Sequence, residues 1–222
     1  MGVGRRSADI DHAHYRHLVL DLSDLGTALP AIDAGIAAYL DSGECRRVAL
    51  VNNAALAGTL GPLERIEPDE FHRMTAANVV APAHLMGLFV ARTPTDVPLR
   101  IVNLSSGAAV RAFPGLAAYG ATKAALRMAA MVLAAELDSP RRNTSRPRDV
   151  AILSYEPAVV DTPMLSRTRS YTPDEFPWVD MFHDVAARNL IVAPAQPAAE
   201  IADFLASNGR PVFSEARYGV SR

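Results

Sequence analysis

Short apolar runs alternate along this chain with longer segments whose apolar residues recur at helical spacing. Such alternation is typical of parallel strands that are joined by crossover helices. The sequence predicts strands over five segments: His17–Leu22, Arg47–Val51, Arg100–Leu104, Asp149–Leu153 and the edge segment Pro211–Phe213. It predicts helices over four others: Leu29–Leu40, Pro68–Arg92, Gly115–Leu137 and Gln196–Ser207. We therefore expect an α/β fold built on a doubly wound parallel sheet.

The segment from Thr162 to about Leu190 differs from the rest because it is polar, irregular and interrupted by prolines. Its apolar side chains are Phe176, Trp178, Met181 and Phe182. These four either pack in the core or line a mobile lid over an apolar substrate. No repeat and no low-complexity linker divides the chain. We expect residues 1–222 to form one domain, with residues 162–190 as a substrate lid within it.

Composition excludes several classes of protein. The 222 residues carry a net charge of −2, which gives no electrostatic footprint for nucleic acid or an anionic membrane. The apolar stretch Val79–Ala91 is too short to cross a bilayer. Because no apolar run follows Arg5 and Arg6, a secretory signal is not expected. Cys45 is the only cysteine, so we expect a cytoplasmic protein without disulfides or a cysteine-rich metal site.

Two further polar clusters have ordinary explanations. His12 and His14 have a spacing that can bind a metal, but no carboxylate or cysteine cluster joins them, so we expect a solvated loop and no metal. A basic stretch precedes the strand predicted at Asp149: Arg141, Arg142, Arg146 and Arg148. No aromatic residues alternate with these arginines, which favours a solvated loop over a nucleic-acid site.

Polar residues follow three of the predicted strands. They are Asp21, the pair Asn52 and Asn53, and the pair Ser105 and Ser106. In open α/β sheets, ligands bind outside the carboxyl ends of the strands, where these residues are expected. Loops between strands and helices are polar in any case, so these loops alone leave a ligand site and plain loops equally open.

Tyr119 and Lys123 lie four residues apart in a helix-forming segment, so their side chains share one face. A tyrosine keeps its proton up to a pH of about 10, and a nearby ammonium lowers that pKa toward the range useful for proton transfer. Ser106 ends a buried strand 13 residues before Tyr119. Taken singly, these residues are a turn cap, a packing residue and a solvated charge. Taken together, they predict a proton-transfer site.

The set Ser106, Tyr119-x-x-x-Lys123 resembles that of the short-chain dehydrogenase/reductase family. The segment Asn52 to Ala55 is similar to the family's Asn-Asn-Ala-Gly turn, with Ala55 in place of glycine. The segment Glu156 to Met164 is similar to its Pro-Gly…Thr segment, with Ala158 in place of glycine. The lid sequence and the C-terminal FSEARYG resemble the sepiapterin reductase and benzil reductase subgroup of small dicarbonyl reductases. The resemblance implies a Rossmann-like fold from Arg5 almost to the C-terminus.

The same resemblance implies an NADP(H)-dependent oxidoreductase that acts on the CH–OH group of an alcohol, or reduces a small ketone or dicarbonyl, by hydride transfer. In it Tyr119 is the general acid and Ser106 orients the carbonyl oxygen. Lys123 lowers the pKa of Tyr119 and holds the nicotinamide ribose, and Asn78 supports a water chain to Lys123. The implied cofactor-binding residues are Arg5, Arg6, Asp21, Leu22, Asn53, Ala54, Tyr119, Lys123, Pro157, Val160 and Thr162.

Arg5 and Arg6 carry the expected preference for NADP(H) over NAD(H). A guanidinium can bind the 2′-phosphate of NADP with two hydrogen bonds. The alternative is an ordinary charged N-terminus. Asn78 likewise is either the catalytic asparagine of the resemblance or a mid-helix residue satisfied by backbone, and Asn53 is either a cofactor contact or a turn former.

The family's fold opens with a strand, a Thr-Gly-x-x-x-Gly-x-Gly turn and a helix, and nothing in this sequence matches that turn. Gly2 and Gly4 precede Arg5 without a helical run behind them. We therefore expect the sheet to lack its first strand and first helix, a piece of about 30 residues. Three explanations are possible: the start is misassigned, the chain is a shortened homologue, or a partner chain supplies the piece. We favour a misassigned start, because loss of the central strand would expose strand edges and destabilise the domain. The alternative function is an impaired homologue that acts as a binding or subunit-stabilising module.

In the family, the two long helices commonly pack against their mates in dimers or tetramers. The second of them, Gly115–Leu137, is rich in small residues that suit close contact: Ala124, Ala125, Ala129, Ala130, Ala134 and Ala135. We therefore expect a homodimer or homotetramer whose other partner is a small carbonyl or alcohol substrate.

Overall fold

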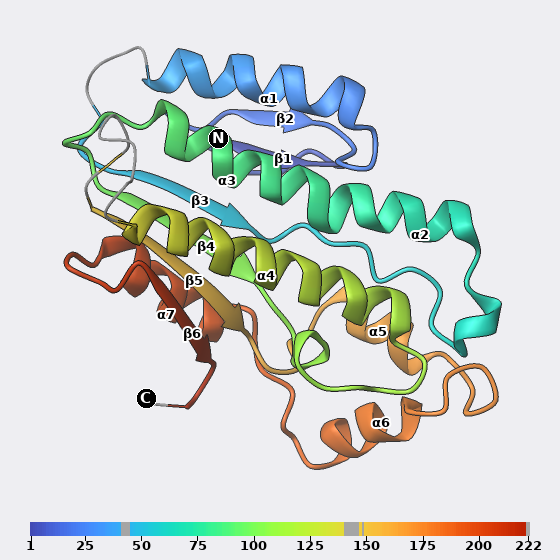
Figure 1. The fold of residues 1–222 in the computed structure, drawn as a ribbon. Helices are drawn as coiled ribbons and strands as arrows, with labels where there is room; N and C mark the ends of the chain where they lie inside the picture. The colour runs from blue at the N-terminus through green and yellow to red at the C-terminus, as the bar shows by residue number, and fades with distance from the viewer. Residues whose placement is uncertain (41–44, 140–146, 148, 221–222) are drawn as a thin grey trace.

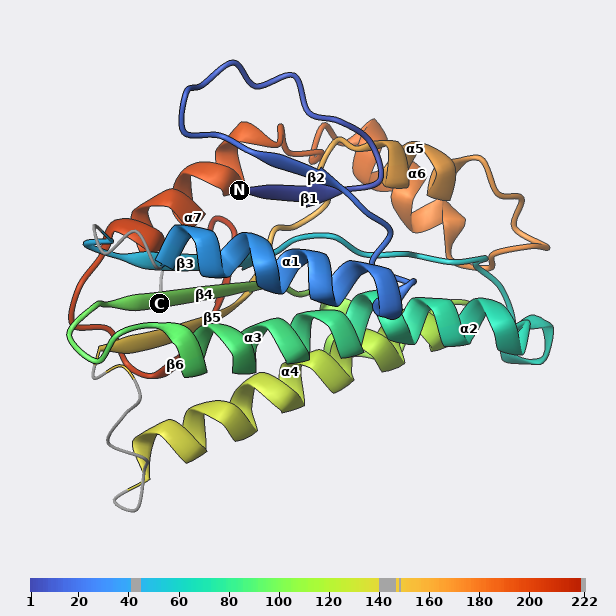
Figure 2. The ribbon, with the colours of Figure 1, turned by 90° about the horizontal axis from the view of Figure 1, so that it is seen from above.

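Helices cover the strands on two sides in the computed structural model, which describes residues 1–40, 45–139, 147 and 149–220. Figure 1 shows α1 (Leu25–Leu40), α3 (Ala81–Arg92) and α4 (Ala117–Asp138) side by side in front of the strands. Figure 2 shows α7 (Ala195–Ala206) on the opposite side. The largest core lies between the front helices and the strands. These layers confirm the predicted α/β class.

The larger sheet has four parallel strands in the order β3-β4-β5-β6. They are β3 (Val48–Asn52), β4 (Leu99–Leu104), β5 (Val150–Glu156) and β6 (Phe213–Arg217). Nearly every residue of β4 and β5 is buried, as expected of central strands covered by helices on both faces. The predicted strands are confirmed, although the edge strand begins where the prediction ended, at Phe213.

A second, two-stranded parallel sheet consists of β1 (Gly2–Gly4) and β2 (His17–Val19). Within the described part of the chain, neither strand is hydrogen-bonded to the larger sheet. A cavity of about 620 Å³ separates β1 from β3, and Ile32 and Ile36 of α1 contribute to its lining. The expected single sheet is therefore divided into two. In β3, Ala49 and Val51 are exposed while their neighbours are buried.

The long helix predicted over Pro68–Arg92 is continuous but changes its winding in the middle. It consists of α2 (Pro68–Thr75), the π-helical turn η2 (Ala76–Val80) and α3. Pro82 has no N–H for the α-helical bond to the carbonyl of Asn78, which explains the wider turn there. By length and composition this helix could cross a membrane, but half of its most apolar window is buried inside the fold. A core helix passes the same test, so this finding is weak evidence for a membrane segment.

The segment predicted as irregular contains two short helices, α5 (Pro163–Arg169) and α6 (Val179–Ala187). Thr162 caps α5 by accepting a hydrogen bond from the backbone N–H of Leu165 at 3.3 Å. Pro163 occupies the first helical position, where its missing N–H costs nothing. The prediction was wrong here because capping, rather than periodicity, signals helices this short. Phe176 is fully buried against Leu60, so this residue packs in a core.

Both remaining short elements are 3₁₀ turns, η1 (Leu63–Arg65) and η3 (Gly107–Ala109). The basic stretch Arg141, Arg142, Arg146 and Arg148 lies outside the described residues. His12 and His14 lie in an exposed loop, as predicted.

Candidate active site

Ser106 and Tyr119 meet where β4 ends and α4 begins. Ser106 starts η3, and its hydroxyl accepts a hydrogen bond from the backbone N–H of Ala108 at 3.2 Å. Burial raises the pKa of Tyr119 above its ordinary value, while a hydrogen bond with the Ser106 side chain lowers it. Ser106 is therefore both the turn cap and the hydroxyl partner of the phenol, and the two explanations of this residue do not exclude each other.

Lys123 lies one helical turn after Tyr119 and is only 4% exposed. Its Nζ donates a hydrogen bond to the carbonyl oxygen of Leu104 at 2.6 Å, which ties α4 to the end of β4. The same nitrogen lies 5.7 Å from the centre of the Tyr119 ring. Burial lowers the pKa of Lys123 to about 8. The Lys123 ammonium thus lies over the Tyr119 ring. The sequence predicted a lowered pKa for Tyr119, but burial raises it.

Asn78 is buried in the π-helical turn, and its side chain joins three segments. Its Nδ2 donates to the carbonyl of Leu56 at 2.8 Å and to the hydroxyl of Thr122 at 3.0 Å. Its Oδ1 accepts from the backbone N–H of Leu56 at 2.8 Å. Thr122 in turn donates to the carbonyl of Tyr119 at 2.8 Å. Asn78 therefore positions the loop after β3 and the first turn of α4, and its role in a water chain stays a prediction.

Thr122 is a residue that the sequence did not single out. It links Asn78 to the backbone of Tyr119 and is 2% exposed. It lies directly before Lys123, on the buried side of α4 that contacts η2, and helical periodicity could have indicated that side.

The loop after β5 brings the predicted residues Pro157, Val160 and Thr162 toward α5. Val160 forms a parallel bridge with Val192, so the two ends of the segment 162–190 lie together. Ala158 adopts a φ of 61°, the left-handed conformation in which glycine is unstrained. The short-chain dehydrogenase/reductase motif has glycine at this position, so the alanine of this chain adopts a strained backbone conformation.

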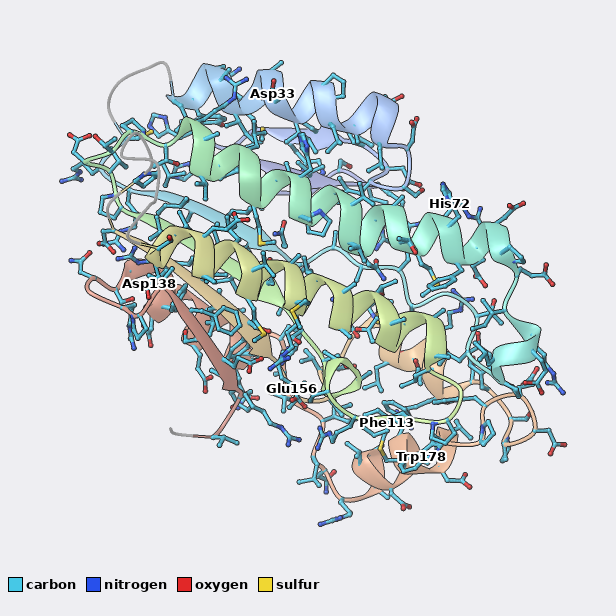
Figure 3. The ribbon with its side chains drawn as sticks, in the orientation of Figure 1. Asp33, His72, Phe113, Asp138, Glu156 and Trp178 are labelled. Atoms are coloured by element: carbon cyan, nitrogen blue, oxygen red, sulfur yellow. The ribbon has the colours of Figure 1, made fainter. Side chains whose placement is uncertain are left out.

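Glu156 connects this loop to two neighbours. Its Oε1 lies 3.3 Å from a guanidinium nitrogen of Arg111 and 3.4 Å from one of Arg217. Figure 3 shows Glu156 near the end of β5, and Phe113 beside Trp178 next to α6. The Phe113 and Trp178 rings meet edge to face with centres 5.5 Å apart. The loop before α4 and the segment before α6 therefore contact each other through aromatic side chains.

A cavity of about 400 Å³ lies beside the carboxyl end of β1 and brings together Arg5 and Asp21. Hydrogen bonds from the backbone and side chain of Ser23 lower the pKa of Asp21, and the charges of Arg5 and Arg73 act in the same direction. Asp21 is thus an ionised acceptor suited to hydroxyl groups, with cationic side chains nearby that suit a phosphate. Arg73 was not predicted, because nothing in its sequence context distinguishes it from a solvated helix charge.

The structure does not bring all predicted cofactor residues to one place. Arg6 does not line the cavity that contains Arg5. Leu22, Asn53 and Ala54 line the other cavity, the one between the two sheets. Across the described residues, no group of three metal-ligating side chains occurs.

The sequence of this chain matches a family model and several known proteins. A family model described as short chain dehydrogenase matches residues 42–172. The benzil reductase ((S)-benzoin forming) of Bacillus cereus is 28% identical over 165 residues, which cover 74% of this chain and 64% of the relative. The sepiapterin reductase of Bos taurus is 35% identical over 138 residues, which cover 58% of this chain and 47% of the relative. The matched regions span less than two thirds of both relatives.

A solved structure supports the same likeness. The crystal structure of a short-chain dehydrogenase/reductase from Burkholderia vietnamiensis has 32% sequence identity and a TM-score of 0.61. The match covers 78% of this chain and 80% of that chain. The parallel sheets and flanking helices described above are therefore those of a Rossmann-like fold.

Proposed function

Because the chain belongs to the short-chain dehydrogenase family, we propose that it is an NADP(H)-dependent oxidoreductase that reduces a small ketone or dicarbonyl. The observation that carries this proposal is the meeting of Ser106, Tyr119 and Lys123 at the end of β4. Two separate stretches of sequence, the loop after β4 and the helix α4, contribute to that meeting. A phenol with a hydroxyl partner and a nearby cation is suited to general acid catalysis.

The nicotinamide, when bound, supplies the hydride, and the protein orients the carbonyl and handles the proton. Tyr119 donates its phenolic proton to the carbonyl oxygen as that oxygen gains negative charge. The raised pKa of Tyr119 keeps the phenol protonated at neutral pH, as a general acid requires. Ser106 donates a hydrogen bond to the same oxygen and so fixes its position. Lys123 holds its charge next to the ring and stabilises the phenolate after transfer.

Two features support a dinucleotide near these residues. The buried ammonium of Lys123 donates one hydrogen bond among the described residues, and its two other N–H groups suit the hydroxyls of a ribose. At the other end, Asp21 suits the hydroxyls of the adenosine ribose, whereas Arg5 suits a 2′-phosphate. The positive charge of Arg5 offsets the negative charge of Asp21, which supports NADP(H) over NAD(H).

The names of the relatives support a dicarbonyl or similar ketone as substrate, since one is a benzil reductase and another a sepiapterin reductase. The segment 162–190 would act as the lid. Its two ends are joined at Val160 and Val192, and the contact of Trp178 with Phe113 links it to the loop that follows Ser106. An aromatic contact at this point favours an apolar or aromatic ketone.

Titration of the purified chain with NADPH and with NADH, followed by nicotinamide fluorescence, tests the proposal. We expect NADPH to bind about tenfold more tightly, because a charge-assisted hydrogen bond to the 2′-phosphate adds about 1.5 kcal/mol or more. Benzil is then expected to consume bound NADPH. Absence of binding by either cofactor at high micromolar concentration would contradict the proposal.

That negative result would favour the second candidate, a non-catalytic module that binds another chain or stabilises a subunit. The observation that favours this candidate is the cavity of about 620 Å³ between the two sheets, which divides the fold beside the cofactor residues Asn53 and Ala54. The same titration therefore decides between the two functions.

We also propose that two copies pack through α4. Of the alanines that the sequence favoured for this contact, Ala130 and Ala134 are buried in the core and are not available. Five exposed apolar residues of the helix lie at a spacing of three and four: Ala121, Ala125, Met128, Val132 and Ala135. This stripe, not the full set of alanines, is the face that a second copy would cover.

Met128→Glu is expected to convert the oligomer to a monomer, because it places a charge in the middle of the stripe. Light scattering coupled to size-exclusion chromatography measures the mass. Leu63→Glu is the matched control, since Leu63 is 70% exposed and lies on η1, away from α4. A wild-type chain that is already monomeric at micromolar concentration would overturn this proposal.

A further inference from the structure

Three arginines from different parts of the chain line the 400 Å³ cavity beside Asp21. Arg5 follows β1, Arg73 lies on α2 and Arg167 lies on α5. None of the three forms an ion pair within 4.0 Å with another described residue, whereas five other arginines of the chain do so. Guanidinium groups repel one another, so their convergence on one cavity without carboxylate partners indicates a site for an anion.

The acidic groups of the cavity do not neutralise this set. Asp21 is engaged by Ser23, whose backbone N–H and hydroxyl donate to its Oδ1 at 2.9 and 2.8 Å. Glu70 accepts a hydrogen bond from the hydroxyl of Thr59 at 3.2 Å. Three cations and two carboxylates leave the lining with a net positive charge, and the positive side chains come from three segments of the chain.

The position of the arginines indicates which anion they bind. Arg5 lines the cavity from the segment after β1, and Arg167 lines it from α5 together with Pro163 and Met164. Three guanidinium groups on one cavity suit an anion with more than one charged group. Guanidinium forks match phosphate oxygens with two parallel hydrogen bonds.

We propose that Arg73 and Arg167 form a diphosphate-binding site, in which side chains of α2 and α5 hold the diphosphate of the dinucleotide. This inference rests on the proposed function, since that function supplies the diphosphate. It also gives α5 a second role. Binding of the anion by Arg167 would draw the N-terminal part of the segment 162–190 toward α2, and so couple cofactor binding to the position of the lid.

The test uses Arg73→Gln and Arg167→Gln in the full chain. Fluorescence titrations give the Kd of NADPH and NADH, and calorimetry at low ionic strength gives the Kd of inorganic pyrophosphate. Each substitution is expected to raise the Kd of all three ligands by about tenfold, because each removes a charge-assisted contact. The factor is expected to be the same for NADPH and NADH, since both contain the diphosphate.

Arg169→Gln is the matched control, because Arg169 is exposed on the same helix but does not line the cavity. It is expected to change each Kd by less than about twofold. Arg5→Gln is expected to weaken NADPH alone. Equal effects of Arg167→Gln and Arg169→Gln would overturn the inference, as would a loss confined to NADPH, which would assign the arginines to the 2′-phosphate.

Pyrophosphate separates this inference from the proposed function. Arginine-dependent binding of pyrophosphate without binding of either dinucleotide would support the diphosphate site and contradict the reductase. Binding of none of the three ligands would overturn both.

Discussion

Tyr119→Phe is expected to lower kcat by about 10²- to 10⁴-fold, the usual contribution of a positioned general acid. The substitution removes only the hydroxyl, so the ring remains packed against the charge of Lys123. Stopped-flow measurement of NADPH oxidation under single-turnover conditions reports this step directly, because product release then does not contribute.

The Kd of NADPH provides the control for Tyr119→Phe. It is expected to change by less than about threefold, because Lys123 keeps its place through the hydrogen bond to Leu104. A variant that loses turnover and NADPH affinity together would show that Tyr119 holds the cofactor site in shape. Unchanged turnover would refute the acid role.

Arg100→Met is expected to lower the free energy of unfolding by about 3 kcal/mol. The Arg100 side chain is fully buried and forms an ion pair with Asp149 at 2.9 Å. It also donates to the carbonyls of Leu99, Asp149 and Ser207 at 2.9, 3.2 and 3.0 Å. Methionine fills similar space but donates nothing, so the carbonyls of Leu99, Asp149 and Ser207 each lose one donor, and the Asp149 carboxylate loses its ion-pair partner. Urea denaturation, with the midpoint compared at an unchanged m-value, measures the loss.

Arg92→Met is the matched control for Arg100→Met. Arg92 forms an ion pair with Asp33 at 2.8 Å, but both side chains are 39% exposed. Because water screens such a pair, its removal is expected to lower stability by less than about 1 kcal/mol. Similar losses in the two variants would show that burial of Arg100 adds nothing.

Strands and long helices were predicted well because their signal is local. β4 and β5 are rich in apolar residues, and α4 differs from its predicted bounds by two residues at its start and one at its end. The two helices of the segment 162–190 were missed because a seven-residue helix such as α5 contains too few turns for a periodic pattern. The sequence signal for α5 is its capping pair, Thr162 and Pro163, and the spacing of apolar residues does not reveal such a pair.

The proximity of Ser106, Tyr119 and Lys123 was predictable because their spacing is set by one strand, one loop and one helix. The pKa shifts of Tyr119 and Lys123 were not predictable, because they depend on how deeply the surrounding loops bury the two side chains. Arg73 and Arg167 are far apart in sequence and resemble ordinary surface arginines until the fold brings both to one cavity.

By itself the sequence determined the α/β class, the order of most elements and the residues able to transfer a proton. These follow from local periodicity and from the chemistry of side chains at fixed spacing along one helix. Only the tertiary structure decided that the sheet divides between β1 and β3, that Lys123 lies over the tyrosine ring and that three arginines meet at Asp21. Those features depend on contacts between segments that are distant in sequence. A local sequence pattern contains no information about the distances between such segments or about their burial.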